Sequence, residues 1–374
     1  MRTTLVVDRW DAARGGQEGY LDALAGELAR RGVEVRVLCR EAAGVPPGVA
    51  VEAVAPPGGG AAGERRFLSA VAWKVGIGAG TEASEGPVLA PRLLSVATHV
   101  QLHGGLFGDA LEAERESMDG VRRPLFRLGT ALNGRRRLLA RYEREALEGP
   151  FPRVMVWTEA LKGRLAGLGV PDGAIRVSPP GVDLSLYRSG PRPPEADRSV
   201  ELLFLAHNAR LKGLRAGLEA LAVARGRGLR ARLSVVGRAP QGPWMRLARR
   251  LGVASAVTWE GPLAPPEVVR RLQGAAALLH PTFLDPCSLA CLEAAACGVP
   301  VITTRRNGAV ERLGPAGAAL VVDDPRDVEG LAMALEEAAE PSRRAPLQEA
   351  ALALRPSLDA RRHLDDVVAW LGVG

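Results

Sequence analysis

The chain has 374 residues, a length that favours two domains over a single hydrophobic core. Apolar residues make up 47% and charged residues 24%, a globular balance that excludes a disordered or fibrous chain. The net charge of +7 does not distinguish between anionic small molecules, a phospholipid surface and nucleic acid as partners.

The cysteines and the apolar windows bear on the cellular compartment. A disulfide framework is not expected in a chain of this size with four cysteines, so we predict reduced thiols. Cys287 and Cys291 could share a helix face, but no second pair stands at zinc spacing, and we expect no metal site. Residues 3–8 are typical of a buried strand rather than a leader, and no apolar window approaches ~20 residues. We therefore expect a cytoplasmic protein.

The first half begins with a βαβ pattern. A strand at 3–8 precedes a glycine turn, a helix with Leu21, Leu24 and Leu28 on one face, and a strand at 33–39. This order predicts a parallel, doubly wound sheet. Further strands are expected at 98–102, 153–157 and 175–178, and a long arginine-rich helical stretch is expected at 121–147.

The same alternation starts again after a Pro- and Gly-rich segment. Expected strands lie at 200–206, 231–237, 256–259, 276–279 and 300–303, and expected helices at 213–225, 243–251, 265–273, 289–297 and 327–337. A last helix near 358–371 carries an apolar stripe that needs a surface to pack on. We predict two Rossmann-like domains at 1–185 and 199–355, a linker at 186–198, and a helix at 356–374 that returns to the first domain.

The strongest chemical signal lies around residues 285–293. Asp285 ends the loop after an expected strand, and Glu293 lies in the helix that follows. The free N–H groups at the start of a helix favour phosphate, and ligands of open α/β sheets bind at the carboxyl ends of the strands. A nucleotide sugar fits this layout, with its diphosphate at Pro286, Cys287, Ser288, Leu289 and Ala290. A loop cap at Asp285 and a solvated acid at Glu293 remain the alternative.

These residues resemble the retaining GT-B glycosyltransferases of group 1, the family 4 type. The family has two glutamates separated by seven residues, where this chain has Asp285 and Glu293, followed by Ala-x-x-Gly-x-Pro-Val-Ile at 295–302. Asp285 is one methylene shorter than the usual glutamate. Other matching elements are Gly15-Gly16, Pro180-Gly181-Val182-Asp183 (with proline where asparagine is usual) and Gly308-Ala309-Val310-Glu311.

The resemblance implies a GT-B fold with two domains facing a central cleft. It also implies transfer of a hexosyl group from a nucleoside diphosphate sugar, with UDP as the expected nucleotide. The acceptor would be a glycan or a lipid-linked molecule, as in cell-envelope polysaccharide or lipopolysaccharide biosynthesis. Retention of configuration is implied, with no metal and no cofactor.

A basic loop at 206–213 follows the first strand of the second domain. Its resemblance to the family's diphosphate loop assigns Lys212 and Arg210 to the leaving diphosphate, with His207 where the family has arginine. By the same resemblance, Asp285 holds hydroxyls of the donor sugar and Glu293 holds those of the ribose. Donor contacts are also expected at Gly15 and Gly16, because glycine lets the backbone approach the diphosphate, and at Gly237 beside the base. Surface basic residues at a helix start remain the alternative.

His103 follows a strand of the first domain in the sequence His103-Gly104-Gly105. It could orient the acceptor or hydrogen-bond to the donor sugar, and a purely structural role is equally open. Asp109 is a weaker candidate.

The arginine run from Arg122 to Arg144 alternates with leucines. Such a segment could contact an anionic membrane peripherally, or it could be a docked helix with a solvated arginine face. Nucleic acid is not an expected partner, because no aromatic interleaving or recognition motif accompanies the basic residues. A GT-B sugar-nucleotide 2-epimerase and a non-catalytic sugar-nucleotide or polyanion-binding protein remain the alternative functions.

Overall fold

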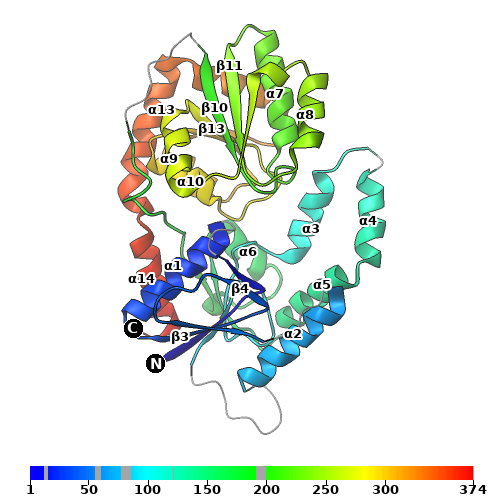
Figure 1. The fold of residues 1–374 in the computed structure, drawn as a ribbon, viewed down its shortest axis with the longest axis vertical. Helices are drawn as coiled ribbons and strands as arrows, with labels where there is room; N and C mark the ends of the chain where they lie inside the picture. Colours follow the sequence, from blue (N-terminus) through cyan, green and yellow to red (C-terminus); the bar gives the residue numbers. More distant parts are fainter. Residues whose placement is uncertain (12–15, 55–59, 77–85, 121, 191–198, 374) are drawn as a thin grey trace. The chain divides into compact units, whose positions relative to one another are not determined.

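The computed structural model describes all residues except 12–15, 55–59, 77–85, 121, 191–198 and 374 (Figure 1). The chain divides into two compact units. The N-terminal unit comprises 1–115, 119–179 and 361–374, and the C-terminal unit comprises 116–118 and 180–360. The division at Pro179 and Pro180 comes a few residues before the predicted one, and most of the predicted linker lies outside the described residues.

The N-terminal unit is built on a seven-stranded sheet in the order β5-β3-β1-β6-β7-β8-β9. All its strand pairs are parallel, and β2 and β4 form a separate parallel pair. The strands are β1 (Arg2–Val6), β2 (Arg9–Asp11), β3 (Glu34–Cys39), β4 (Glu41–Ala43), β5 (Val49–Ala53), β6 (Val88–Ala90), β7 (His99–Gln101), β8 (Arg153–Val156) and β9 (Ile175–Val177). The helices are α1 (Gly16–Arg30), α2 (Gly60–Lys74), α3 (Phe107–Glu116), α4 (Arg122–Leu132), α5 (Gly134–Leu147), α6 (Glu159–Ala166) and α14 (Ala360–Leu371).

Alternating side chains of this sheet bury two separate cores, one on each face. Leu5 and Val37 pack with the leucines of α1 and with Val367 and Trp370 of α14. Val6 faces the other way, into the core that includes residues of α2, α5 and α6. The predicted return of the C-terminal helix to the first domain is confirmed, because its apolar stripe completes the core beneath α1.

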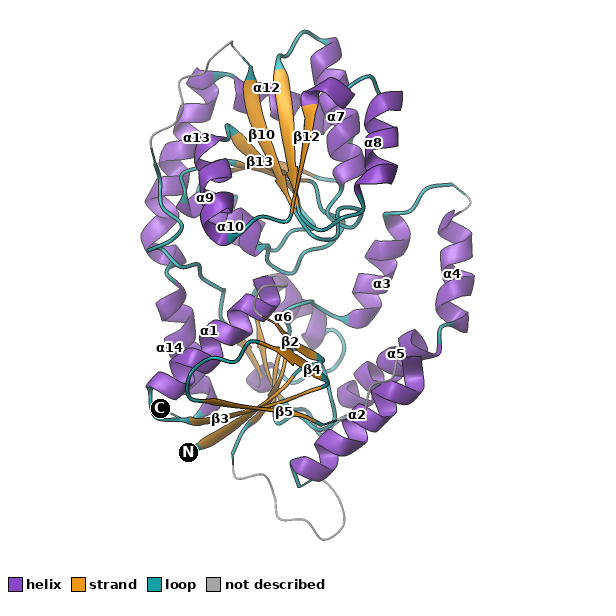
Figure 2. Ribbon diagram, in the orientation of Figure 1, coloured by secondary structure: helices purple, strands orange, loops and turns teal. Residues whose placement is uncertain are grey.

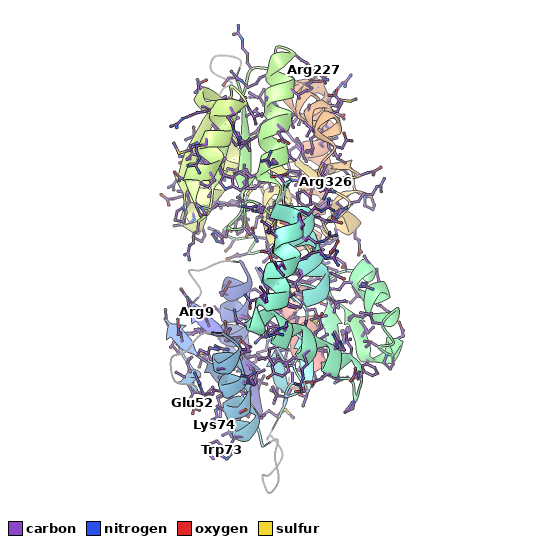
Figure 3. The ribbon with its side chains drawn as sticks, turned by 90° about the vertical axis from the view of Figure 1, so that its right-hand side faces the viewer. Arg9, Glu52, Trp73, Lys74, Arg227 and Arg326 are labelled. Carbon is purple, nitrogen blue, oxygen red and sulfur yellow. The ribbon has the colours of Figure 1, made fainter. Side chains whose placement is uncertain are left out.

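The edge of the sheet is tied to α2 by charge. Lys74, at the end of α2, pairs with Glu52 of β5 at 2.6 Å, and its ammonium lies 5.4 Å from the centroid of the Trp73 ring. Figure 3 shows these three side chains together at the lower end of the unit. Trp73 is 68% exposed, so this contact lies on the surface.

The arginine-rich helical stretch expected at 121–147 is helical in the structure from Arg122 to Leu147, except at Asn133. The structure has two helices, α4 and α5, separated at Asn133. The Asn133 side chain accepts a hydrogen bond from the N–H of Arg136 at 3.0 Å, so it caps α5. A capping asparagine followed by Gly134 is a start signal that overrides the continuous leucine spacing.

The C-terminal unit has a six-stranded sheet in the order β12-β11-β10-β13-β14-β15, and all its pairs are parallel. Its strands are β10 (Val200–Leu205), β11 (Ala231–Val236), β12 (Val257–Gly261), β13 (Ala277–His280), β14 (Val301–Thr304) and β15 (Ala319–Val322). Its helices are α7 (Leu214–Gly226), α8 (Gln241–Arg250), α9 (Pro265–Gly274), α10 (Leu289–Ala296), α11 (Val310–Leu313), α12 (Val328–Ala339) and α13 (Pro341–Leu354). Figure 2 shows helices on both faces of this sheet, so the predicted second doubly wound domain is confirmed.

Candidate functional site

The candidate site lies on the loops that follow β10, β13 and β14, at the carboxyl end of the C-terminal sheet. This is the edge at which ligands of open α/β sheets bind. The three loops are held to one another by backbone contacts: the Phe283 N–H donates to the Leu211 carbonyl at 2.8 Å, and the Asp285 N–H donates to the Arg306 carbonyl at 3.0 Å.

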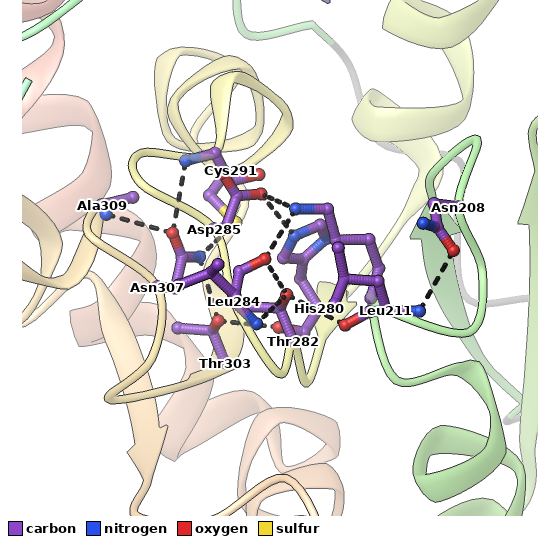
Figure 4. Close-up of polar contacts among 12 residues, drawn as sticks. Asn208, Leu211, His280, Thr282, Leu284, Asp285, Cys291, Thr303, Asn307 and Ala309 are labelled. Atoms are coloured by element: carbon purple, nitrogen blue, oxygen red, sulfur yellow. Dashed lines mark hydrogen bonds and ion pairs between the residues drawn. The ribbon is translucent and has the colours of Figure 1, made fainter. Parts of the chain in front are cut away.

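Lys212 and Asp285 meet at the centre of these loops. The Lys212 ammonium donates to Asp285 Oδ2 at 2.7 Å and to the carbonyl of Leu284 at 3.0 Å. Both side chains are largely buried, with 19% of Lys212 and 12% of Asp285 exposed. Figure 4 shows Asp285 within this network of hydrogen bonds. The structure therefore joins two residues that the sequence places 73 positions apart.

His280 is a second partner of Asp285, at 3.2 Å from Nε2 to Oδ2. Burial lowers the pKa of His280 despite the adjacent carboxylate, so its neutral ring donates from Nε2. Burial alone would raise the pKa of Asp285, but the Lys212 charge and the His280 hydrogen bond hold it well below its usual range. Asp285 is thus an ionised, buried carboxylate, and His280 is a functional residue that the sequence reasoning missed.

The backbone of Asp285 is fixed by the neighbouring loop. Its N–H bonds to the carbonyl of Arg306, and its carbonyl accepts from the N–H of Gly308 at 2.8 Å. The loop is in turn organised by Asn307, whose Oδ1 accepts from the N–H groups of Ser288 and Ala309 at 3.2 and 3.1 Å. This anchoring places the shorter aspartate side chain within reach of Lys212, without the extra methylene of glutamate.

Helix α10 begins next to this pair and has eight residues. Ser288 is its N-cap residue, and its own N–H is taken by Asn307. The N–H groups of Leu289 and Ala290 donate to no acceptor within the described part of the chain. These two groups and the helix dipole suit an anion.

The other predicted donor residues around α10 contribute differently. Cys287 and Ser288 are 2% and 4% exposed, so their side chains are parts of the core rather than ligand groups. Burial raises the pKa of the Cys287 thiol well above its usual range. Pro286 is partly exposed and precedes them. A ligand at this helix start would meet backbone rather than these side chains.

Two glycines shape the loops that carry the basic residues. Gly213 has φ +79°, and a Cβ there would lie 2.0 Å from the Pro281 carbonyl oxygen. Gly237 has φ +139°, and a Cβ there would lie 1.9 Å from the carbonyl oxygen of Ala206. Only glycine fits at either position. Gly213 thereby sets the direction of Lys212, and Gly237 brings the ends of β10 and β11 together.

His207 and Arg210 lie apart from the central pair. The N–H of Arg238 donates to His207 Nδ1 at 3.3 Å, which links this exposed histidine to the loop after Gly237. Arg210 is partly buried, and among the described residues its guanidinium makes no hydrogen bond or ion pair with Asp285. Its predicted role at the diphosphate stays a prediction.

Glu293 lies on α10 and is partly buried. Burial raises its pKa to about 7, and a hydrogen bond from the hydroxyl of Tyr187 opposes that rise. Tyr187 was not singled out from the sequence, although it follows Pro180-Gly181-Val182-Asp183 by a few residues. Tyr187 belongs to no motif of its own, so the sequence gives no pattern by which to find it.

His103 lies in the N-terminal unit, directly after β7, and is 5% exposed. Its ring stacks on Trp157 with centroids 4.8 Å apart and packs edge-on against Tyr20. Burial, followed by the nearby His363, lowers its pKa to about 3, so the ring is neutral. Neither ring nitrogen has a hydrogen-bond partner within the described residues. Asp109, the weaker candidate, pairs with Arg164 at 2.9 Å.

The predicted glycine pair is only partly described. Gly16 is the first residue of α1 and is exposed, whereas Gly15 lies outside the described residues. Nothing in the described part of the chain tests their contact with a diphosphate.

A charged cluster at the carboxyl end of the N-terminal sheet was also missed. Glu64 is fully buried, and its carboxylate pairs with Arg40 at 2.6 Å, Arg92 at 2.5 Å and Arg135 at 3.2 Å. Burial raises the pKa of Glu64, but the three guanidinium groups outweigh this and lower it. The four residues come from distant parts of the chain, so no local spacing reveals them.

Comparisons with known proteins identify the family. Residues 199–340 match the family described as Glycosyl transferases group 1. The D-inositol 3-phosphate glycosyltransferase of Actinosynnema mirum is 31% identical over 327 residues, which cover 79% of this chain and 76% of that protein. The chain belongs to the group 1 glycosyltransferases. The enzyme of the same name from Acidothermus cellulolyticus is 33% identical over 217 residues. The present chain spans about half of that enzyme's length, 47%.

Solved structures show that the fold is GT-B. WaaG, a glycosyltransferase involved in lipopolysaccharide biosynthesis, matches all of both chains with a TM-score of 0.83 at 19% identity. Sucrose-phosphate synthase from Thermosynechococcus elongatus matches 99% of this chain and 98% of its own, with a TM-score of 0.76 at 19% identity. Anabaena HepE, in complex with UDP and glucose, matches 100% of this chain and 99% of its own, with a TM-score of 0.72 at 16% identity.

The described residues include neither a membrane-spanning helix nor a metal-binding cluster. No helix in the described ranges has the length and apolar character needed to cross a bilayer. Across the same residues, His, Cys, Asp and Glu side chains form no group of three that could hold a metal ion.

Proposed function

We propose that this glycosyltransferase transfers a hexosyl group from a UDP-sugar to a glycan or lipid-linked acceptor, with retention of configuration. The observation that carries the proposal is the buried Lys212–Asp285 pair next to the two unpartnered N–H groups that begin α10. A cation and oriented backbone donors together suit a diphosphate with an attached sugar. The complex of HepE with UDP and glucose supports the choice of nucleotide.

In this proposal the site residues of the C-terminal unit bind different parts of the donor. The diphosphate binds the N–H groups of Leu289 and Ala290, and the Lys212 ammonium turns from Asp285 toward it. Asp285, still held by His280, accepts hydrogen bonds from the sugar hydroxyls. Glu293 accepts those of the ribose.

The chemistry is dissociation of the sugar–phosphate bond with attack by the acceptor hydroxyl on the same face. The leaving diphosphate gains negative charge, which Lys212 and the α10 dipole stabilise. A diphosphate oxygen takes the proton of the acceptor hydroxyl. In this proposal the protein supplies the positive charge, and no metal is required.

The N-terminal unit supplies the acceptor side. His103 is neutral and its ring nitrogens are unpartnered within the described residues, so it has the capacity for one hydrogen bond to a sugar hydroxyl in either direction. We assign it to the acceptor or to the donor sugar.

Helix α4 supports peripheral contact with an anionic membrane, where a lipid-linked acceptor would be found. Leu125, Leu128 and Leu132 are 61%, 58% and 73% exposed and recur at helical spacing. Arg123 and Arg127 are exposed on the same helix. Exposed leucines with flanking arginines are typical of a helix that lies in a membrane interface.

The proposal is tested by incubating the full chain with UDP-, GDP- and ADP-sugars in EDTA and measuring release of nucleoside diphosphate. We expect one UDP-sugar to turn over, and Lys212→Ala to lower the rate by at least about 10²-fold, because it removes the charge that faces the leaving group. The matched control is Lys162→Ala, which breaks the surface pair of Lys162 with Asp172 at 2.9 Å and should leave the rate unchanged.

Each outcome of this assay has a definite meaning. Turnover that needs a divalent cation would contradict metal independence. Equal loss in Lys212→Ala and Lys162→Ala would contradict the assignment of Lys212. If no nucleoside diphosphate binds by calorimetry, the donor assignment is wrong as a whole.

A further inference from the structure

The segment from Pro180 to Tyr187 is clamped against the last part of the C-terminal unit. A Cβ on Gly181 would lie 2.5 Å from the backbone of Ala360, so the two stretches of backbone touch. The Val182 N–H donates to the Leu358 carbonyl at 2.8 Å, and the Ala360 N–H returns a bond to the Val182 carbonyl at 3.1 Å. The glycine and the valine of this motif therefore anchor the segment.

Asp183 then turns the chain. Its Oδ1 accepts from the Ser185 N–H at 2.8 Å and from the Ser185 hydroxyl at 2.6 Å. Its carbonyl accepts from the N–H of Tyr187 at 2.8 Å. This is the side-chain-to-backbone pattern by which aspartate stabilises a tight turn. The turn fixes the backbone position from which the Tyr187 side chain starts.

Arg355 holds the far end of the turn. Its Nη2 donates to the carbonyl of Leu184 at 2.6 Å and to that of Tyr187 at 3.4 Å. The Tyr187 hydroxyl bonds to the carboxylate of Glu293 on α10. The backbone contacts of Val182, the Asp183 turn and the Arg355 hydrogen bonds thus together bring the Tyr187 phenol to the partly buried Glu293 carboxylate.

We propose that Tyr187 is a positioning residue for donor binding, whose hydroxyl holds the Glu293 carboxylate in the orientation that accepts the ribose hydroxyls of the nucleotide. The proposal rests on the donor function assigned above. It gives the Pro180–Asp183 element a task in the C-terminal unit, namely to present Tyr187 to α10.

The surroundings of Glu293 show why it needs such a partner. Burial raises the pKa of Glu293 to about 7, so the hydroxyl is the contact that favours its ionised form. Burial and the Glu293 charge raise the pKa of Tyr187, so the phenol keeps its proton and acts as the donor. The other titratable or charged groups around the pair are Cys297, whose thiol pKa burial raises to about 12, Asp183, and the cation of Arg355.

Loss of the hydroxyl should therefore change the pH at which donor binding is gained. Without it, Glu293 stays protonated to higher pH and accepts ribose hydroxyls poorly. A hydrogen bond to a charged group corresponds to about one pKa unit or more, a tenfold change in the ionisation equilibrium. The phenyl ring of a Tyr187→Phe variant keeps the packing, so the effect is confined to the hydroxyl.

The experiment is calorimetric titration of the full chain with UDP from pH 5.5 to 9. For Tyr187→Phe we expect affinity about fivefold weaker than wild type at pH 7, restored near pH 9, with the midpoint of the pH profile moved upward by about one unit. Glu293→Gln should bind weakly and supply the baseline for titration of UDP itself. Tyr142→Phe, which removes a phenol from α5, is the matched control and should follow wild type.

The outcomes separate this inference from the proposed function. Wild-type binding with an unmoved pH profile in Tyr187→Phe would overturn the role of Tyr187 and leave the donor function standing. A loss of affinity that is equal at every pH would also overturn it, because a general structural defect is not rescued by ionising Glu293. If wild type binds no nucleoside diphosphate at any pH, the proposed function fails, and the inference fails with it.

Discussion

At the scale of single residues, the candidate site is a set of buried charges that satisfy one another before any ligand arrives. Lys212 and Asp285 are paired at 2.7 Å, and His280 adds a neutral donor to the same carboxylate oxygen. Breaking such a pair leaves an uncompensated buried charge. In the proposed function a diphosphate replaces the carboxylate as the partner of Lys212, and Asp285 keeps the hydrogen bond from His280.

Glu293 is the exception, because no cation pairs with it among the described residues and burial raises its pKa to about 7. A raised carboxyl pKa means that the folded chain is relatively stable below the unfolded pKa of about 4.3 and loses that stability as the pH rises through 7. The accumulated cost above pH 7 is at most about 4 kcal/mol.

We therefore predict that Glu293→Gln is more stable than wild type at pH 8.5 and similar to it at pH 4.5. The amide still accepts from Tyr187 but carries no buried charge. The measurement is urea unfolding at both pH values, with Glu219→Gln, on the surface of α7, as the control. A variant that is destabilised equally at both pH values would contradict the raised pKa of Glu293. We also expect the gain in stability at pH 8.5 to be accompanied by a loss of UDP affinity.

At the scale of elements, the strongly patterned parts of the chain were predicted and the weakly patterned parts were not. The central strands β10 and β11 and helix α7 lie within a residue or two of their predicted bounds, because buried parallel strands are continuous apolar runs. The edge strand β5 and the three-residue β6 were missed, because so few residues give no reliable period. Helix α13 was missed because Pro346 lies inside it.

The motif residues of the site could be predicted from the sequence, but the contacts between them could not. Asp285, Glu293 and Lys212 lie at fixed spacings within short motifs, so sequence alone points to them. His280, Asn307 and Tyr187 act through contacts between loops that meet only in the folded sheet. Their roles follow from geometry and from burial, which the sequence does not record.

The exposed leucine face of α4 gives a prediction about membrane binding. Leu128→Asp places a charge on its exposed leucine face, and we expect partitioning onto vesicles rich in anionic lipid to fall about tenfold. Cosedimentation with phosphatidylglycerol vesicles measures this effect, and vesicles of phosphatidylcholine alone should bind both proteins weakly. Met333→Asp, 59% exposed on α12, is the control. Equal binding of Leu128→Asp and wild type would contradict a membrane role for α4.

At the scale of the whole molecule, the C-terminal unit is inserted into the chain of the N-terminal unit. The chain leaves the first unit at Pro179 and returns at Arg361 to complete its core with α14. The apolar stripe on this last helix made its return predictable. Both ends of the insertion meet in the contacts of Val182 with Leu358 and Ala360, close in sequence to the turn that presents Tyr187.

In the proposed function a nucleoside diphosphate binds at the start of α10 in the C-terminal unit. A crystal structure of the chain with UDP shows whether it does. We predict the diphosphate within hydrogen-bond distance of the Leu289 and Ala290 N–H groups and of the Lys212 ammonium, with the ribose hydroxyls on Glu293 and Tyr187 still bonded to that carboxylate. A nucleotide bound elsewhere, with the Lys212–Asp285 pair and Glu293 untouched, would contradict the account.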